Sequence, residues 1–159
     1  MHHKLIAALG AATLAASGAA ACSSHHATPA AQDTVRGSGI AVARTNDATV
    51  IVDGQQHKVD GQLACTTYET DNEVGIGIGT APKDVLIAVT LGDKPTVKRV
   101  TLQSIIGDYN LFAVYPEHGD NTATATKNGK TYTITGKAWG VNNSGQELTV
   151  PFQVTVTCP

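Results

Sequence analysis

Dipeptides that favour tight turns recur along the chain from about residue 50 onward and limit the length of any helix or strand. Asp53-Gly54, Asp60-Gly61 and Asn128-Gly129 are dipeptides of the kind that form tight hairpin turns. Between them lie short runs in which apolar and polar residues alternate, as in β-strands with one buried face. No segment shows a long helical period with caps. The chain therefore predicts many short antiparallel strands.

The expected strands follow one another at the regular spacing that is typical of a sandwich or barrel. The run at 85–91 is almost continuously apolar and fits either a buried strand or a short helix. A length of 159 residues favours one domain. The predicted fold is all-β, a small antiparallel β-sandwich or open barrel. Besides 85–91, we expect strands at residues 49–52, 55–59, 62–67, 73–78, 97–102, 111–115, 121–127, 131–138 and 152–158.

Residues 1–21 have the order of a signal peptide. A short positive start with Lys4 precedes an apolar run, and small residues then lead to Cys22. The run is short and rich in Ala and Gly, which argues against a membrane-spanning helix. We expect this segment to be removed during secretion.

Residues 19–22, Ala-Ala-Ala-Cys, resemble a bacterial lipobox, although Ala19 stands where such boxes usually carry Leu. The resemblance implies a diacylglyceryl group on Cys22; the alternative is ordinary secretion with Cys22 as a spare thiol. The chain has three cysteines. If Cys22 is lipidated, Cys65 and Cys158 remain and allow one disulfide, which an oxidising compartment favours. A bond over so long a separation would stabilise the domain by roughly 3–5 kcal/mol.

Residues 22–45 are expected to be the lipidated cysteine and a flexible polar tether, and residues 46–159 the β domain. Ser, His, Thr and Pro predominate early in the tether and offer too little apolar surface to order it. From about residue 40, Gly, Thr and Val become frequent and apolar residues alternate with polar ones. His25 and His26 lack the further ligands that a metal site needs. The formal charge is −2, and cleavage would make it more negative by removing Lys4. This charge argues against nucleic-acid binding and leaves the lipid as the membrane attachment.

Several local patterns suggest chemistry but favour a structural reading. Residues 75–80, Gly-Ile-Gly-Ile-Gly-Thr, lack the Gly-Lys-Ser/Thr end of a phosphate loop and fit a glycine-interrupted strand. Glu69, Asp71 and Glu73 would point to one side of a strand, as calcium ligands or as a solvated edge. Residues 117–120, Glu-His-Gly-Asp, form a second acidic group in an expected loop. We expect no metal and no cofactor besides the acyl chains.

An enzyme is not expected, because no Gly-x-Ser-x-Gly elbow is present and neither His57 nor His118 has a spacing that nominates a triad. The remaining feature is apolar. A small sandwich can open to admit an acyl chain, and the residues that would line such a groove otherwise simply fill the core. These residues are Val85, Ile87, Val89, Leu111 and Phe112.

The ordered motifs of the β domain resemble the mycobacterial 19 kDa lipoprotein antigen family. The resemblance covers roughly residues 50–158 together with the lipobox, while the tether is similar only in composition. Its motifs are Val-Ile-Val-Asp-Gly at 50–54, Val-Asp-Gly at 59–61, Cys-Thr-Thr at 65–67, Ala-Thr-Lys-Asn-Gly at 125–129, Tyr-Thr-Ile-Thr-Gly at 132–136, then Ala138 and Gly140-Val141, and Phe-Gln-Val-Thr-Val-Thr-Cys at 152–158.

The resemblance implies an acylated, surface-exposed envelope antigen on the extracytoplasmic face of the cell membrane. It places the lipid on Cys22 and the disulfide between Cys65 and Cys158. Family members are recognised by host Toll-like receptors through the acylated N-terminus and are often glycosylated on the tether, and the family has no established catalytic residues. The expected function is a non-enzymatic surface or adhesin-like module; the alternative is a carrier or sensor of lipid or glycolipid that uses a groove in the β domain. A hydrolase is a third, weaker hypothesis.

Overall fold

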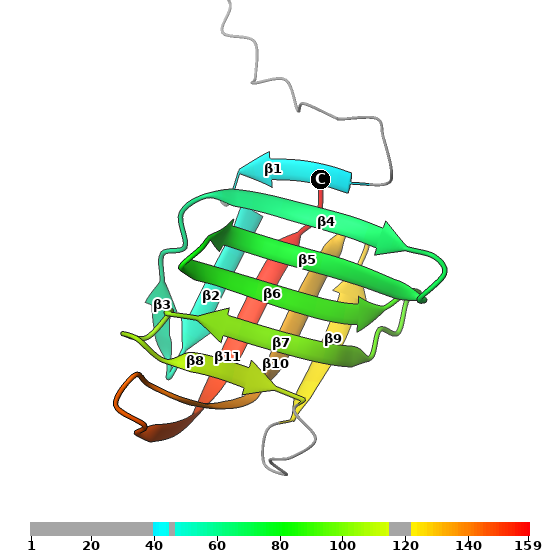
Figure 1. Cartoon of the computed structure of the whole chain (residues 1–159). Coiled ribbons are helices and arrows are strands. Elements are labelled where there is room, and N and C mark those ends of the chain that lie inside the picture. Colours follow the sequence, from blue (N-terminus) through cyan, green and yellow to red (C-terminus); the bar gives the residue numbers. More distant parts are fainter. Residues whose placement is uncertain (1–39, 45–46, 115–121) are drawn as a thin grey trace, which may run out of the picture. The chain divides into compact units, whose positions relative to one another are not determined.

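A computed structural model describes residues 40–44, 47–114 and 122–159. These residues form eleven strands that join into one curled antiparallel sheet (Figure 1). The fold prediction is confirmed. The strands are β1 (Ile40–Arg44), β2 (Ala48–Val52), β3 (Gln55–His57), β4 (Gln62–Tyr68), β5 (Glu73–Thr80), β6 (Lys83–Thr90), β7 (Val97–Gln103), β8 (Asn110–Ala113), β9 (Ala123–Asn128), β10 (Thr131–Val141) and β11 (Glu147–Thr157).

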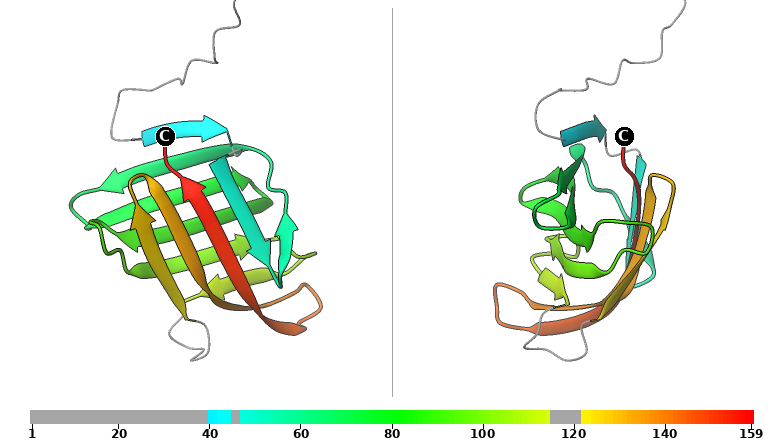
Figure 2. Two further views of the ribbon diagram at one scale, coloured as in Figure 1. Left: turned by 180° about the vertical axis from the view of Figure 1, so that it is seen from behind. Right: turned by 90° about the vertical axis from the view of Figure 1, so that its right-hand side faces the viewer.

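The sheet folds over on itself into two layers whose strands cross. One layer follows the order β1-β4-β5-β6-β7-β8, and the other holds β9, β10, β11, β2 and β3. Figure 1 shows the green strands of the first layer running across the strands of the second, and the right-hand view of Figure 2 shows the layers nearly edge-on. The core lies between the layers and consists mainly of Val, Ile and Leu side chains, such as Leu63, Val85, Leu102, Ile134 and Val154, all at most 1% exposed.

Strand β10 connects the two layers by changing its partner along its length. Its first half pairs with β9, its last three residues pair with β8, and β11 runs along its other side. Gly136 and Gly140 lie where the partners approach most closely. A Cβ at Gly136 would collide with the carbonyl oxygen of Thr122, and one at Gly140 with that of Asn110. The bend between the layers therefore depends on two residues without side chains.

The opposite side of the curled sheet is joined covalently. Cys65 in β4 and Cys158, just after β11, form a disulfide with a Cα–Cα distance of 5.9 Å and a sequence separation of 93. Cys158 also donates a backbone hydrogen bond to Lys130 at 3.0 Å. The disulfide of the predicted fold is thus present, and it ties β4 in the first layer to the end of the last strand in the second.

Several local expectations change in the structure. The run at 85–91 is a strand and not a helix, because β6 pairs with both β5 and β7. The turn after β9 comprises Gly129 and Lys130, since Asn128 still pairs with Thr131; Gly129 takes a φ of 58° at the first turn position. Strand β1 pairs with β4 and lies within the segment that we expected to be tether. No helix in the described ranges is long and apolar enough to cross a membrane.

Candidate binding face

The side of the first layer that points away from the core carries two adjoining hollows. Their volumes are about 310 and 300 Å³, and Glu73, Ala88 and Arg99 line both. A ligand of moderate size commonly occupies a site of this volume. We call this surface the hollow face and define it by its outward residues on β4 to β8. These residues are Ala64, Thr66, Tyr68, Glu73, Gly75, Gly77, Leu86, Ala88, Arg99, Thr101 and Phe112.

Small residues on neighbouring strands form the floor of the hollow face. Gly75 pairs with Ala88, and Gly77 pairs with Leu86, so the glycines of the 75–80 run lie in the middle of the layer. A Cβ at Gly75 would lie 3.1 Å from Tyr68 Cε2, and one at Gly77 would lie 3.7 Å from Leu86 Cδ2. The two side chains therefore rest against bare backbone. The reading of this run as a glycine-interrupted strand is confirmed.

Two large apolar side chains remain exposed on this floor. Tyr68 is 47% exposed and Leu86 is 45% exposed, and Val141 at 37% is the other large hydrophobic residue of the described ranges with comparable exposure. Because the core beneath them is closed, this apolar surface faces solvent instead of another layer. Exposed apolar side chains that gather in one place are typical of binding surfaces.

A bulge in the β6–β7 pairing places two adjacent cations outside the core. Ala88 pairs with Arg99 whereas Val89 pairs with Val97, so Lys98 is the extra residue. A regular alternation over the expected strand at 97–102 would put Lys98 on the same side as Val100 and Leu102, but the bulge shifts the register and leaves Lys98 exposed while Val100 and Leu102 are buried. Lys98 and Arg99 are both exposed.

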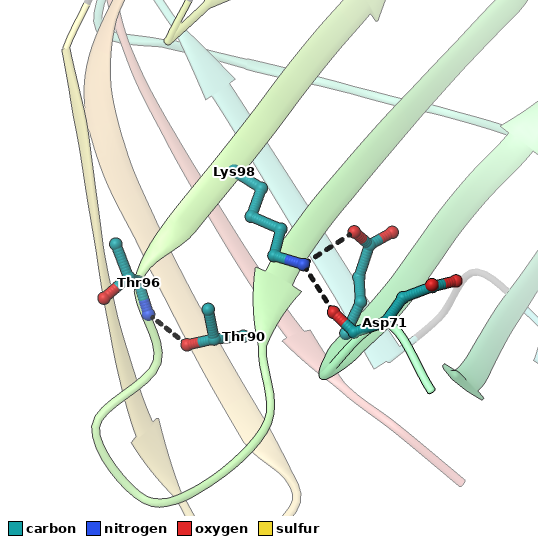
Figure 3. A network of polar contacts seen from close by, with 5 residues as sticks. Asp71, Thr90, Thr96 and Lys98 are labelled. Carbon is teal, nitrogen blue, oxygen red and sulfur yellow. Dashed lines mark hydrogen bonds and ion pairs between the residues drawn. The ribbon is translucent and has the colours of Figure 1, made fainter. Parts of the chain in front are cut away.

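The two cations have different surroundings. Lys98 forms an ion pair with Glu73 at 3.3 Å and donates a hydrogen bond to the backbone oxygen of Asp71 at 2.7 Å (Figure 3). Arg99 makes no hydrogen bond or ion pair with any residue that the structure describes. The Lys98 charge is therefore neutralised locally, whereas the Arg99 guanidinium has no partner among the described residues.

The end of the β6–β7 hairpin is fixed by reciprocal hydrogen bonds. The amide of Thr96 donates to Thr90 Oγ1 at 2.8 Å, and the amide of Thr90 donates to the carbonyl of Thr96 at 2.9 Å (Figure 3). This closure comes directly before the bulged strand. It holds the segment from which Lys98 and Arg99 project.

Aromatic residues continue the hollow face toward β10. Thr101 pairs with Phe112, and Phe112 pairs with Trp139, so these three residues form one row across β7, β8 and β10. Thr101 is 7% exposed, although it points away from the core. Of this row, Thr101 and Phe112 line the hollow, and Trp139 lies next to Phe112 on β10.

The other end of β6 carries a partly buried carboxylate. Asp84 lies between Gly79 and Gln103, and its Oδ1 is buried without a hydrogen-bond partner among the described residues. Burial raises the pKa of the Asp84 carboxyl because it disfavours the charged form. A charged carboxylate is therefore unfavourable at this position, which lies outside both hollows.

The acidic residues proposed as calcium ligands do not share one side of a strand. Glu69 and Asp71 lie in the turn between β4 and β5, where Asn72 has a φ of 50°. Of the three, only Glu73 is in a strand, and its carboxylate forms an ion pair with Lys98. Within the described residues, no three His, Cys, Asp or Glu side chains are grouped as metal ligands. The 117–120 group lies outside the described residues.

The remaining site residues fall in separate places. His57, at the end of β3, has no side-chain hydrogen bond to another described residue. Cys22, His25, His26 and His118 lie outside the described ranges. Of the proposed acyl-groove residues, Val85, Val89 and Leu111 are fully buried and Ile87 is 3% exposed, whereas Phe112 points to the hollow face. Four of the five proposed residues therefore fill the core, and the two hollows lie on the outside of the sheet.

The fold and this face together define a class of protein, a small disulfide-closed β domain that presents an open, apolar-floored surface. Comparison with known proteins identifies the family. Residues 41–158 match the family model described as Mycobacterium 19 kDa lipoprotein antigen, and the chain belongs to this family.

The similar curated proteins are lipoproteins of mycobacteria. Lipoprotein LpqH of Mycobacterium avium is 36% identical over 111 residues, which are 69% of this chain and 66% of that protein. Lipoprotein LpqH of Mycobacterium tuberculosis strain H37Rv is 35% identical with 69% and 67% covered. The putative lipoprotein LppO of that strain is 30% identical over 126 residues, with 70% and 72% covered.

The matched region thus spans about two thirds of the LpqH proteins. The lipoprotein names indicate association with a membrane or the cell envelope. Neither the family description nor these names denote an enzyme, in agreement with the non-enzymatic expectation.

Proposed function

We propose that this protein is a non-enzymatic surface module of the cell envelope, attached to the extracytoplasmic face of the cell membrane by acyl chains on Cys22. The domain would act as an antigen or adhesin-like binding module that uses the hollow face. The observation that carries the binding role is the gathering of Tyr68, Leu86 and an unpaired Arg99 outside a filled core. A surface of this kind suits recognition of a partner better than enclosure of one.

The signal-peptide pattern and the cysteine count support the lipid attachment. The disulfide uses Cys65 and Cys158, which leaves Cys22 as the one cysteine without a pairing role. Acyl chains contribute about 0.8 kcal/mol per buried CH₂, so a diacylglyceryl cysteine would hold the protein firmly on a membrane. The polar residues after Cys22 would then separate the domain from the lipid surface.

A membrane fractionation of the cells tests this attachment. Cys22→Ala should move the protein from the membrane fraction to the soluble fraction, whereas Cys22→Ala and wild type should have the same melting temperature because the disulfide is intact. Mass spectrometry of the wild-type protein should show acyl chains on a chain that begins at Cys22. External protease should digest the anchored protein on cells whose cytoplasmic marker stays intact. Membrane retention of Cys22→Ala would contradict the anchor.

The acylated N-terminus is also the expected ligand of a host Toll-like receptor. A reporter cell that expresses the receptor should respond to the acylated protein and not to Cys22→Ala. The second candidate function, a sensor or carrier of lipid or glycolipid, is favoured by the apolar floor of the hollow face. In that case the ligand would lie on the outside of the first layer, because the residues between the layers are closely packed.

A further inference from the structure

The hollow face combines a small-residue floor with one unpaired positive charge. From Arg99 on β7, the paired residues Ala88, Gly75 and Thr66 cross β6, β5 and β4 in a single row. Tyr68 and Leu86 stand on the two sides of this row, each against a glycine. We infer that the row binds a single-chain fatty carboxylate, with the alkyl chain on the floor and the carboxylate on Arg99. This inference rests on the proposed binding role of the face and specifies its ligand.

The length of the row suits an extended alkyl chain. Neighbouring strands lie about 4.8 Å apart, so the three steps from β7 to β4 cover about 14 Å. The two hollows adjoin at Ala88 and Arg99, which gives one continuous trough with Arg99 near its middle. Ala88 is only 3% exposed, so an alkyl chain over β6, β5 and β4 would mainly cover Gly75, Tyr68 and Leu86. Removal of this apolar surface from water would drive binding.

The floor discriminates against a sugar. Gly75, Gly77 and Ala88 have no polar side-chain atoms. Strand β5 pairs with β4 on one side and with β6 on the other, so its backbone groups are already engaged. Hydroxyl groups of a carbohydrate that lie over these three residues would find no side-chain partner there, and burial of unsatisfied polar groups is costly. An alkyl chain has no such requirement.

The charges of the trough favour a single negative charge. Lys98 is occupied by Glu73 and by the backbone of Asp71. Among the described residues, Arg99 is then the one cation of the trough without a partner, and a guanidinium can bind a carboxylate through two parallel hydrogen bonds. Glu73 lines the same hollows and would repel a second negative charge. A monovalent carboxylate is therefore the best match.

Titration of the full chain carrying Cys22→Ala with dodecanoate tests the assignment, because this variant has no acyl chains of its own to fill the trough. Calorimetry would give the affinity, and fluorescence of Trp139, the single tryptophan, would report occupancy beside Phe112. Dodecanoate should bind below its micelle concentration. Acetate and dodecanol should bind at least about tenfold more weakly, since each lacks one of the two contacts.

Two further variants in this background separate charge from shape. Arg99→Gln should weaken dodecanoate binding by about ten- to a hundredfold and leave dodecanol binding unchanged. Ala88→Leu should weaken both ligands by filling the floor, with the melting temperature measured to verify folding. Lys137→Gln removes an exposed cation on the other layer and should leave binding intact.

Three results would overturn the inference. These are no dodecanoate binding, equal binding of dodecanol, or wild-type affinity in Arg99→Gln. None of them affects the membrane attachment, which fractionation measures separately. A sugar or protein ligand on an intact hollow face, found together with the first result, would leave the proposed binding role standing and replace the fatty carboxylate.

Discussion

The two outward surfaces of the β domain follow the same alternation and yet differ in chemistry. On the second layer, we define the threonine face by the outward residues of β9, β10, β11 and β2. One row across these strands consists of threonines alone, and two Thr–Thr hydrogen bonds reinforce the face at Thr124–Thr135 and Thr131–Thr157, at 3.2 and 2.9 Å. The row comprises Thr126, Thr133, Thr155 and Thr49.

On the hollow face, the equivalent positions carry glycine, alanine, aromatic residues and arginine. The β-branched residues of the threonine row cover the backbone evenly, whereas Gly75 and Gly77 leave space beside Tyr68 and Leu86. The inward residues of both layers are similar Val, Ile and Leu side chains. The two faces therefore differ in their outward residues alone, and the threonine face serves as an internal reference for the proposed binding face.

The largest change in stability is expected when the disulfide that joins the two layers is removed. The double variant Cys65→Ala/Cys158→Ala releases a constraint over 93 residues, and we expect a loss of about 4–5 kcal/mol of unfolding free energy. Denaturant unfolding followed by circular dichroism and by Trp139 fluorescence measures it. Coincident transitions would show that the two layers unfold as one unit. A free energy equal to that of wild type would contradict the role of the disulfide as a structural link.

The next largest change in stability is expected at the bend between the layers. It can be tested with the same substitution, glycine to alanine, at one position in the bend and at one outside it. Gly140→Ala would force a Cβ into the Asn110 carbonyl, so we expect a loss of about 2–3 kcal/mol or a failure to fold. Gly77→Ala places the same methyl group 3.7 Å from Leu86, an ordinary contact, and should change stability by less than about 0.5 kcal/mol. Thermal melts of both variants would test this. Equal costs at the two positions would show that the close approach at Gly140 is unimportant.

Much of the fold could be predicted because its determinants are local. Asp53-Gly54 and the turn near Gly129 mark hairpins, and the alternation of Val74, Ile76 and Ile78 identifies the buried side of β5. The bulge at Lys98 could not be predicted, because it depends on the register between β6 and β7 and not on the sequence of either strand. The same limit applied to Glu69 and Asp71, whose turn interrupts what had read as a strand.

The candidate site was predictable in part. The glycine-interrupted strand and Phe112 were recognised, but Tyr68 and Leu86 were not, and the other residues proposed for a groove fill the core. Outward and inward residues of β6 are both apolar, so alternation alone does not show that Leu86 faces solvent while Val85 and Ile87 face the core. The exposure of Arg99, which has no partner among the described residues, depends on the pairing of β6, β7 and β8 and on the bulge at Lys98. Such a site becomes visible only when the register across the whole layer is known.

The smallest effect expected concerns Asp84, which lies on the same side of the first layer as the hollow face but outside it. Burial raises the pKa of this carboxyl in the folded protein, so the folded state holds its proton more tightly than the unfolded state does. Stability is then lost as pH rises from the ordinary Asp value through the raised pKa. Asp84→Asn removes the ionisation and should stabilise the protein at pH 7, with a gain that disappears in acid.

Melting temperatures of wild type and Asp84→Asn between pH 3 and pH 7 measure this effect. The Asp93→Asn variant is the matched control, because Asp93 is exposed in the loop after β6 and should show no such gain. A gain for Asp84→Asn that persists unchanged at low pH would mean that the amide forms a new hydrogen bond and that desolvation is not the cause. Because Asp84 lines neither hollow, dodecanoate affinity should be equal in the two proteins. A changed affinity would mean that the binding face extends along β6 beyond Leu86.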